Sequence, residues 1–103
     1  MIVTVFRSRL MPGAREDYLA LVDRMSELAR AMPGYISHNG FFADDGERVT
    51  VVEFESEEAL RGWRMHPAHI EAQRKARKIY YSECSVQVCE VVRESKFNRA
   101  EAA

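Results

Sequence analysis

The sequence is poor in cysteine, and this shortage excludes one class of small protein. Its 103 residues include only Cys84 and Cys89, which form no CxxC motif. Two cysteines are too few for the disulfide framework of a secreted mini-domain. Their separation of five residues within one expected strand sends the side chains to opposite faces, so they cannot readily bond to each other. We therefore expect both to be reduced, small packing residues.

The chain also lacks an excess of either charge, a long apolar run and every common cofactor motif. Its 15 Lys and Arg against 16 Asp and Glu give a formal net charge of −1, which offers no attraction to nucleic acid or acidic lipid. No stretch has the apolar length of a membrane span or signal peptide. P-loop, GxGxxG, GxSxG and paired-carboxylate motifs are missing. We expect a cytoplasmic protein that binds neither nucleic acid nor membrane, and we expect no cofactor.

Hydrophobic periodicity predicts the order β-α-β-β-α-β, which is the ferredoxin-like α+β arrangement of two βαβ halves around a four-stranded antiparallel sheet. Ser56 is expected to cap a short helix. Pro67 suits the first turn of the helix that follows. The expected strands span residues 1–10, 35–43, 47–55 and 82–94, and the expected helices span 14–32, 57–66 and 68–81. Residues 1–97 then form one domain, and 98–103 form a C-terminal tail.

Large apolar side chains occupy both alternating faces of the expected strands, as Val3 and Val5 do opposite Ile2 and Phe6. Helices of this fold cover only one face of the sheet, so the other face should be polar if it met water. The chain has no spare element to cover a second apolar face. A homodimer that packs sheet against sheet is the simplest solution, because twofold symmetry is the commonest closure.

The segment GWRMHPAHIEAQ, residues 62–73, gathers the only tryptophan and two of the three histidines. Trp63 could pack the short helix on the sheet, form one wall of a pocket for a flat aromatic ligand, or do both. His66 and His69 form an H-x-x-H pair with no third ligand at metal-binding spacing. Either imidazole could instead transfer a proton beside Trp63, or both could be polar residues at an exposed helix junction.

Other candidates are more ambiguous. Arg7 and Arg9 can pair across the sheet with Glu53 and Glu55 to hold the register, or Arg7 can bind an anionic or phenolic oxygen. Of the adjacent tyrosines at the end of the last helix, we expect one in the core and one at a pocket, and we take Tyr80 as the substrate-binding candidate. His38 lies in the middle of a strand and is expected at a surface or interface.

Three segments resemble the antibiotic biosynthesis monooxygenase domain family, whose members are dimeric α+β barrels. They are VFRSRLMPG, MPGYISHNGFFADDGERVTVVEFES and LRGWRMHPAHIEAQRKARKIYYSECSVQVCEV, and the resemblance covers nearly all of residues 1–97. The family commonly shows a Trp followed closely by a short HP-x-H segment and a helix rich in Gln and Arg. Trp63, His66 and His69 match that pattern.

The resemblance implies a monooxygenase that needs no metal or flavin and oxidises a quinol, anthrone or polyketide-like phenol with O2. Trp63 would then form the ring wall, and His66 or His69 would assist proton transfer. A haem-degrading branch relies on an Asn in the first strand and a later His on the helix, and this sequence has neither. Other relatives have no established activity, so a non-catalytic dimeric protein that binds an aromatic metabolite is the alternative.

Overall fold

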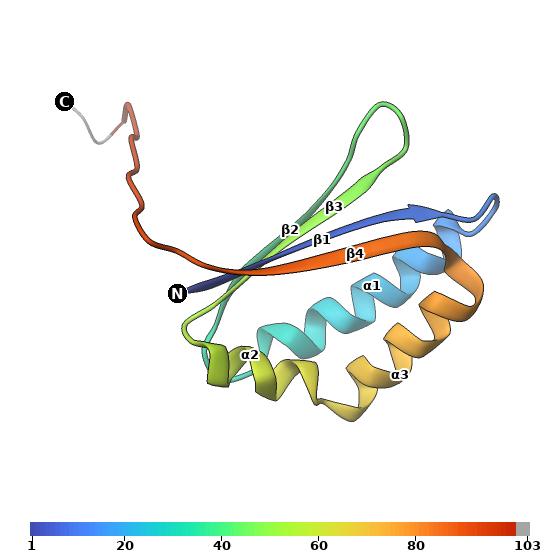
Figure 1. Ribbon diagram of the computed structural model, residues 1–103, viewed down its shortest axis with the longest axis horizontal. Coiled ribbons are helices and arrows are strands. Elements are labelled where there is room, and N and C mark those ends of the chain that lie inside the picture. The colour runs from blue at the N-terminus through green and yellow to red at the C-terminus, as the bar shows by residue number, and fades with distance from the viewer. Residues whose placement is uncertain (101–103) are drawn as a thin grey trace.

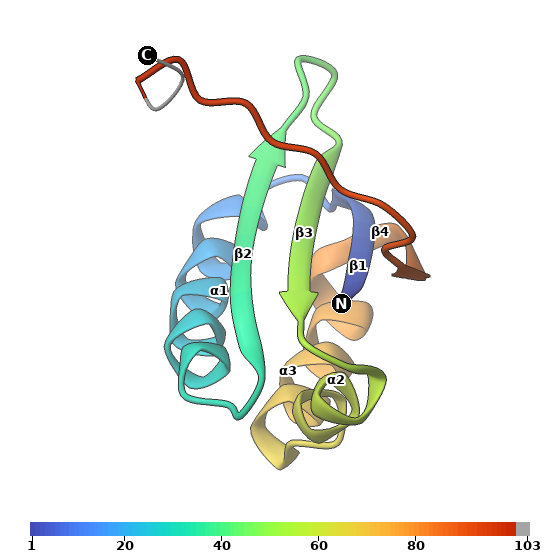
Figure 2. The same ribbon diagram turned by 90° about the vertical axis from the view of Figure 1, so that its left-hand side faces the viewer.

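The computed structural model describes residues 1–100, and its strands form one antiparallel sheet in the order β2-β3-β1-β4. Three helices cover a single face of this sheet (Figures 1 and 2). The predicted ferredoxin-like fold is confirmed, with the second crossover divided between two helices. The elements are β1 Ile2–Leu10, α1 Arg15–Arg30, β2 Tyr35–Phe42, β3 Arg48–Phe54, α2 Glu57–Arg64, α3 Pro67–Lys75 with a π-helical continuation Ala76–Tyr80, and β4 Tyr81–Glu90.

Local signals in the sequence place several of these boundaries. Ser56 caps α2 as predicted, because its Oγ accepts a hydrogen bond from the backbone N–H of Ala59 at 3.1 Å. Pro67 opens α3, where its missing N–H costs nothing. Gly34 follows α1 with φ of +79°, and a Cβ at that position would lie 2.5 Å from the Cβ of Ala59. The connection between α1 and β2 therefore requires glycine for its backbone and for the space beside α2.

Two buried clusters join the helices to the sheet and to each other. One lies between α1 and α3 and contains Tyr18, Leu21 and Tyr80 together with three alanines. The other joins the end of α1 to α2 and β3 and contains Ala29, Phe54, Leu60 and Trp63. Phe54 is the most deeply buried of the large side chains, at 1% exposure. The two clusters hold the helices away from the middle of the sheet, where a cavity remains.

The register of the sheet corrects the predicted ion pairs. β1 and β3 are neighbours as expected, but Arg7 lies opposite Val49, while Glu53 lies opposite Val3. Arg7 therefore forms a two-pronged ion pair with Glu47, at 2.8 and 3.0 Å, beyond the start of β3. Arg9 likewise reaches Asp45 in the turn between β2 and β3. These ion pairs therefore link β1 to the turn between β2 and β3, at the end of the sheet and not in its middle.

The open edge and the end of the chain differ from the expectation. β4 ends at Glu90, and from Val91 to Ala100 the chain continues without regular structure past the sheet (Figure 1). The predicted tail, 98–103, lies partly outside the described residues. Cys84 and Cys89 are free, but both are exposed on this edge strand, so they do not serve as the packing residues that the sequence predicts. Within residues 1–100, no helix has the length and apolar character to cross a membrane.

Candidate active site

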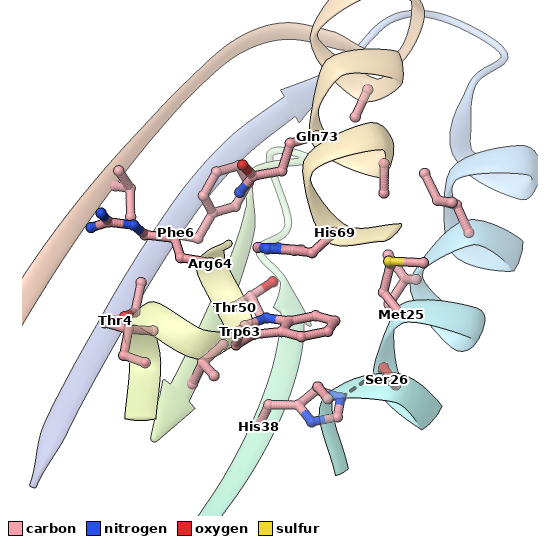
Figure 3. A pocket seen from close by; sticks show the side chains of 18 of the residues that line it. Thr4, Phe6, Met25, Ser26, His38, Thr50, Trp63, Arg64, His69 and Gln73 are labelled. Carbon is pink, nitrogen blue, oxygen red and sulfur yellow. Dashed lines mark hydrogen bonds between the residues drawn. The ribbon is translucent and has the colours of Figure 1, made fainter. Parts of the chain in front are cut away.

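A cavity of about 320 Å³ lies between the sheet and its helices. Along β1, β2 and β3 its sheet side is formed by residues of even number, including Thr4 and Phe6 of β1 and Thr50 of β3. Met25 lines it from α1 (Figure 3). Most of the wall is aliphatic or aromatic, and the volume lies in the range of sites that bind small organic molecules. The cavity is the place in this chain where a flat apolar ligand would be removed from water.

Trp63 serves both of the roles that the sequence left open. It is 6% exposed and packs with Ala29, Phe54 and Leu60, so it fixes α2 on the sheet. The same side chain lines the cavity (Figure 3). Because its ring is held on one side by the core, the side facing the cavity is a rigid wall.

His69, on α3, stacks on Trp63 with ring centroids 4.3 Å apart and planes inclined by 21°. It lines the cavity, and its Nδ1 is buried with no hydrogen-bond partner in the described chain. Burial lowers the pKa of His69 to about 4, against a smaller opposing effect of the Trp63 carbonyl. The imidazole is therefore neutral near pH 7 and forms part of the same aromatic wall.

His66 does not line the cavity with His69. It precedes Pro67 with extended backbone, and its Nδ1 accepts the backbone N–H of Ala68 at 3.1 Å, which caps α3. Its ring lies 5.7 Å from that of Trp63 but outside the cavity lining. The HPAH segment thus supplies a cap and a wall residue. No group of three or more potential metal-ligating side chains occurs in the part of the chain that the structure describes.

His38 occupies the cavity, and the prediction of a surface or interface position is wrong. It is half-buried on β2 and lines the cavity together with Ser26 of α1. Its Nε2 lies 2.7 Å from the Oγ of Ser26, and its Nδ1 lies 2.6 Å from the hydroxyl oxygen of Tyr35. Burial, reinforced by the cations Arg30 and Arg48, lowers the pKa of His38. The only sequence signal for this position is the alternation along β2, which places His38 on the face of the sheet that the helices cover.

Two other predicted site residues lie elsewhere. Arg7 projects from the face of the sheet opposite the helices, where Glu47 binds its guanidinium. Tyr80 is in the core beside Tyr18, with no part in the cavity lining. Tyr81 lines the cavity instead, and its hydroxyl donates to that of Tyr18 at 3.2 Å. Burial raises the pKa of the Tyr81 phenol, which keeps it protonated. The strand begins at Tyr81, and this exchanges the roles of the two tyrosines.

Arg48 is a buried cation beside this site that sequence reasoning missed. It is 7% exposed, and its guanidinium lies over the rings of Phe42, at 4.9 Å, and Tyr18, at 5.8 Å. Within residues 1–100 no carboxylate lies at ion-pair distance from it. Gly40 makes room for it, because a Cβ there would overlap the guanidinium. The uncompensated charge makes this end of the cavity electropositive.

The sequence model of the antibiotic biosynthesis monooxygenase family matches residues 1–75, which include β1 and the Trp63–His69 pair. The chain belongs to this family. A relative from Bacillus subtilis, the uncharacterized protein YqjZ, is 32% identical over 80 residues, which cover 78% of this chain and 70% of the relative. The family resemblance inferred from the sequence is thus confirmed.

Solved structures show the same fold. Rv0793 from Mycobacterium tuberculosis superposes with a TM-score of 0.83 at 25% identity, covering 92% of this chain and 98% of its own. SnoaB from Streptomyces nogalater, described as a cofactor-independent oxygenase, superposes with a TM-score of 0.77 at 15% identity, covering 90% and 94%. At that lower identity the likeness to SnoaB concerns the fold alone.

The arrangement in this family member limits what chemistry the chain can perform by itself. The cavity offers aromatic surface for stacking, aliphatic surface that excludes water, and a small number of hydroxyl and imidazole groups. Such groups can bind and orient an aromatic ring and can move protons near neutral pH. No nucleophile–base–orienter triad around a cysteine is present, because both cysteines lie exposed on β4.

Proposed function

We propose that the protein is a cofactor-independent monooxygenase that oxidises a small electron-rich aromatic compound, such as a quinol, an anthrone or a polyketide-like phenol, with O2. The observation that carries this proposal is the apolar cavity walled by the stacked Trp63 and His69, with His38 and Ser26 as the polar pair at its edge. Membership of the antibiotic biosynthesis monooxygenase family supports it.

The proposed chemistry uses the substrate itself as the source of electrons. A quinol that loses a proton becomes an electron-rich anion, which can pass an electron to O2 and then bond to the reduced oxygen at a ring carbon. Loss of water from the resulting peroxide yields a hydroxyquinone. One oxygen atom of O2 enters the product, the other leaves as water, and all four electrons come from the substrate. The protein has to desolvate the substrate, orient it and accept its proton.

The Trp63–His69 wall suits the orienting part of this task. A flat ring can lie against the wall that the stacked Trp63 and His69 form, since aromatic pairs gain roughly 0.5–1.5 kcal/mol beyond the burial of their area. His69 stacks on the indole and extends the same aromatic wall along the cavity, and its buried, neutral ring adds no charge beside the substrate. The electropositive end near Arg48 favours the anionic form of the substrate over the neutral form.

Oxygen uptake by metal-stripped protein tests the proposal. The substrate panel would contain hydroquinones, dihydroxynaphthalenes and anthrones, each compared with its protein-free rate of oxidation. We expect uptake above that rate with at least one compound, and a loss of about tenfold or more in Trp63→Phe, which keeps an aromatic core residue but shortens the wall. Isotopically labelled O2 should place one labelled atom in the product. The matched control is Tyr80→Phe, which changes an aromatic residue outside the cavity.

Absence of uptake with every compound would contradict the enzymatic proposal. If one of the same compounds then quenched the fluorescence of Trp63 with a saturable, micromolar dependence, the result would favour the alternative of a non-catalytic protein that binds an aromatic metabolite. Catalysis and binding without catalysis can be distinguished, because fluorescence quenching measures binding without requiring turnover.

We also propose that the protein is a homodimer that packs sheet against sheet. On the uncovered face Val5 lies directly opposite Val51, and Val3 and Val49 flank this pair opposite Glu53 and Arg7. Phe41 on the same face is 58% exposed. An apolar patch of this kind on one face of a small domain is typical of an interface, and the ion pairs of Arg7 and Arg9 form its polar rim.

Light scattering at micromolar concentration tests the dimer. Val5→Asp places a charge in the middle of the patch, directly opposite Val51, and should convert a dimer of the wild type into a monomer because the charge would be buried without a partner. Ala20→Asp, at an exposed position of α1, is the matched control and should remain dimeric. A monomeric wild type would refute this interface.

A further inference from the structure

A connected chain of three proton-carrying groups reaches the cavity, and the family pattern around Trp63 does not include it. Tyr35, His38 and Ser26 form it, with contacts of 2.6 Å at Nδ1 and 2.7 Å at Nε2 of the imidazole. Ser26 and His38 line the cavity, whereas Tyr35 is partly buried outside the lining and packs against the core cluster that contains Phe54 and Trp63. The imidazole is thus held at both nitrogens, and the hydroxyl of Ser26 stands on the cavity side (Figure 3).

We propose that Ser26 and His38 together remove the proton of the substrate, with Tyr35 as the positioning residue that holds the imidazole. This inference rests on the proposed function. In the productive tautomer His38 donates Nδ1–H to the Tyr35 oxygen, and Nε2 accepts the Ser26 hydroxyl proton. The lone pairs of Ser26 Oγ are then free to accept a proton from a phenolic substrate in the cavity.

The transfer balances in protons and charge. The substrate O–H bond breaks and leaves its electron pair on the phenolate, while a new O–H bond forms on Ser26. The original Ser26 proton moves to Nε2 of His38, which becomes an imidazolium next to the new phenolate. Tyr35 keeps its own proton throughout. The imidazolium returns its proton by the reverse path to the oxygen atom that leaves as water, so both residues finish in their starting state.

The surroundings keep His38 in its neutral form near pH 7, the form in which a nitrogen can accept a proton. The charged or titratable groups that face it are Arg30 from α1, Tyr35 from its own strand and Arg48 from β3, and Arg64 and His69 line the same cavity from α2 and α3. Burial, followed by the two cations, lowers the pKa of His38, so its ring is neutral and has a nitrogen lone pair that can accept a proton. The same positive field stabilises the phenolate that the transfer creates.

His69 is the rival within the cavity, and its geometry is poorer. Its ring is stacked flat on Trp63, and its Nδ1 is buried with no hydrogen-bond partner in residues 1–100. It lines the cavity itself, but within residues 1–100 no hydroxyl hydrogen-bonds to its Nδ1 to relay a proton. His66 lies outside the lining, where it caps α3. Of the three histidines, His38 alone has both a relay on the cavity side and an orienting partner behind it.

The first experiment measures the ionisation of a bound phenol and needs no turnover. 4-Nitrophenol would be titrated with the protein across a pH range, and the fraction bound as the coloured phenolate recorded. We expect the wild type to lower the apparent pKa of the bound phenol, and His38→Gln and Ser26→Ala to lose that effect. Alanine is a good helix former, so Ser26→Ala should keep α1 intact. An unchanged ionisation in both variants would overturn the proposal.

The second experiment follows oxidation of 1,4-dihydroxynaphthalene. His38→Gln should lower kcat/KM by about 100-fold or more at neutral pH, the usual range for loss of a general base, and the deficit should narrow as the pH rises toward the ionisation of the free substrate. Tyr35→Phe should shift the pH profile without abolishing it. His66→Gln is the control and should stay within about twofold, because its ring is outside the cavity.

The two experiments separate failure of the relay from failure of the proposed function. If the wild type oxidises the substrate and His38→Gln keeps both its rate and its pH profile, the relay is refuted while the oxygenase survives. If no compound is oxidised but the bound nitrophenol ionises only when His38 and Ser26 are both present, the relay stands and the oxygenase fails.

Discussion

His69 should make the protein progressively less stable as the pH falls from about 6.5 to about 4. Its pKa is about 4 in the folded protein, compared with 6.5 for an unburied histidine. Above both values the ring is neutral in the folded and the unfolded chain, and the stability is fully present. Between them only the unfolded chain binds a proton at this site, so acidification favours unfolding.

The size of the effect follows from the two pKa values. Each pH unit across the window costs about 1.4 kcal/mol, so the loss reaches about 3 kcal/mol at pH 4. That is a large fraction of the stability of a domain of this size. Below pH 4 both states are protonated at His69, and this contribution stops changing.

Urea unfolding of the wild type and His69→Gln, followed by far-ultraviolet circular dichroism at several pH values, would measure it. The carboxylates and His38 titrate in both proteins, so the difference between the two free energies of unfolding isolates His69. We expect any advantage of the wild type at pH 7 to shrink by about 3 kcal/mol toward pH 4. Ala20→Gln, an exposed substitution on α1, should give a difference that does not vary with pH. A constant difference for His69→Gln would show that its folded pKa is ordinary and would refute the reasoning.

Three further substitutions test the packing around the site by the same unfolding measurement. Gly34→Ala should destabilise the protein by clearly more than Gly13→Ala. Both glycines have positive φ, so either substitution should lower the free energy of unfolding by about 1–2 kcal/mol. Only at Gly34 would the new Cβ also meet a neighbour, the Cβ of Ala59 at 2.5 Å. Equal losses for the two variants would contradict the close contact of α2 with this turn. Ser56→Ala should cost about 1 kcal/mol, and an unchanged midpoint would mean that the cap contributes nothing. Trp63→Ala should cost about 3–5 kcal/mol, whereas a loss below about 1 kcal/mol would show that its packing is dispensable.

Much of the architecture could be predicted from the sequence because its causes are local. The spacing of apolar residues distinguishes α1 from the strands on either side of it, and Ser56 and Pro67 mark where α2 and α3 begin through hydrogen bonds within a few residues. The family and the role of Trp63 as a wall residue could also be predicted from the sequence, because the residues that indicate them form one contiguous segment. Such signals need no knowledge of distant contacts.

The composition of the site depended on contacts between distant parts of the chain. The predicted pairing of Arg7 with Glu53 or Glu55 is wrong, because only the register of β1 on β3 shows that Arg7 lies opposite Val49. The sequence pattern does not separate Tyr80 from Tyr81, because the exact end of the π-helical segment decides which of the two rings enters the cavity. A one-residue change in where a strand begins reverses which face a side chain occupies.

His38 is the clearest case of a role that tertiary structure decided. The sequence predicts that His38 lies in a strand, and the alternation along that strand indicates which face of the sheet its side chain occupies. Its burial, its contact with Ser26 twelve residues away on α1 and the cations that lower its pKa arise only when the helix is packed on the sheet. A side chain acquires its chemistry from the groups that surround it, and here those groups come from three elements that only the folded chain brings together.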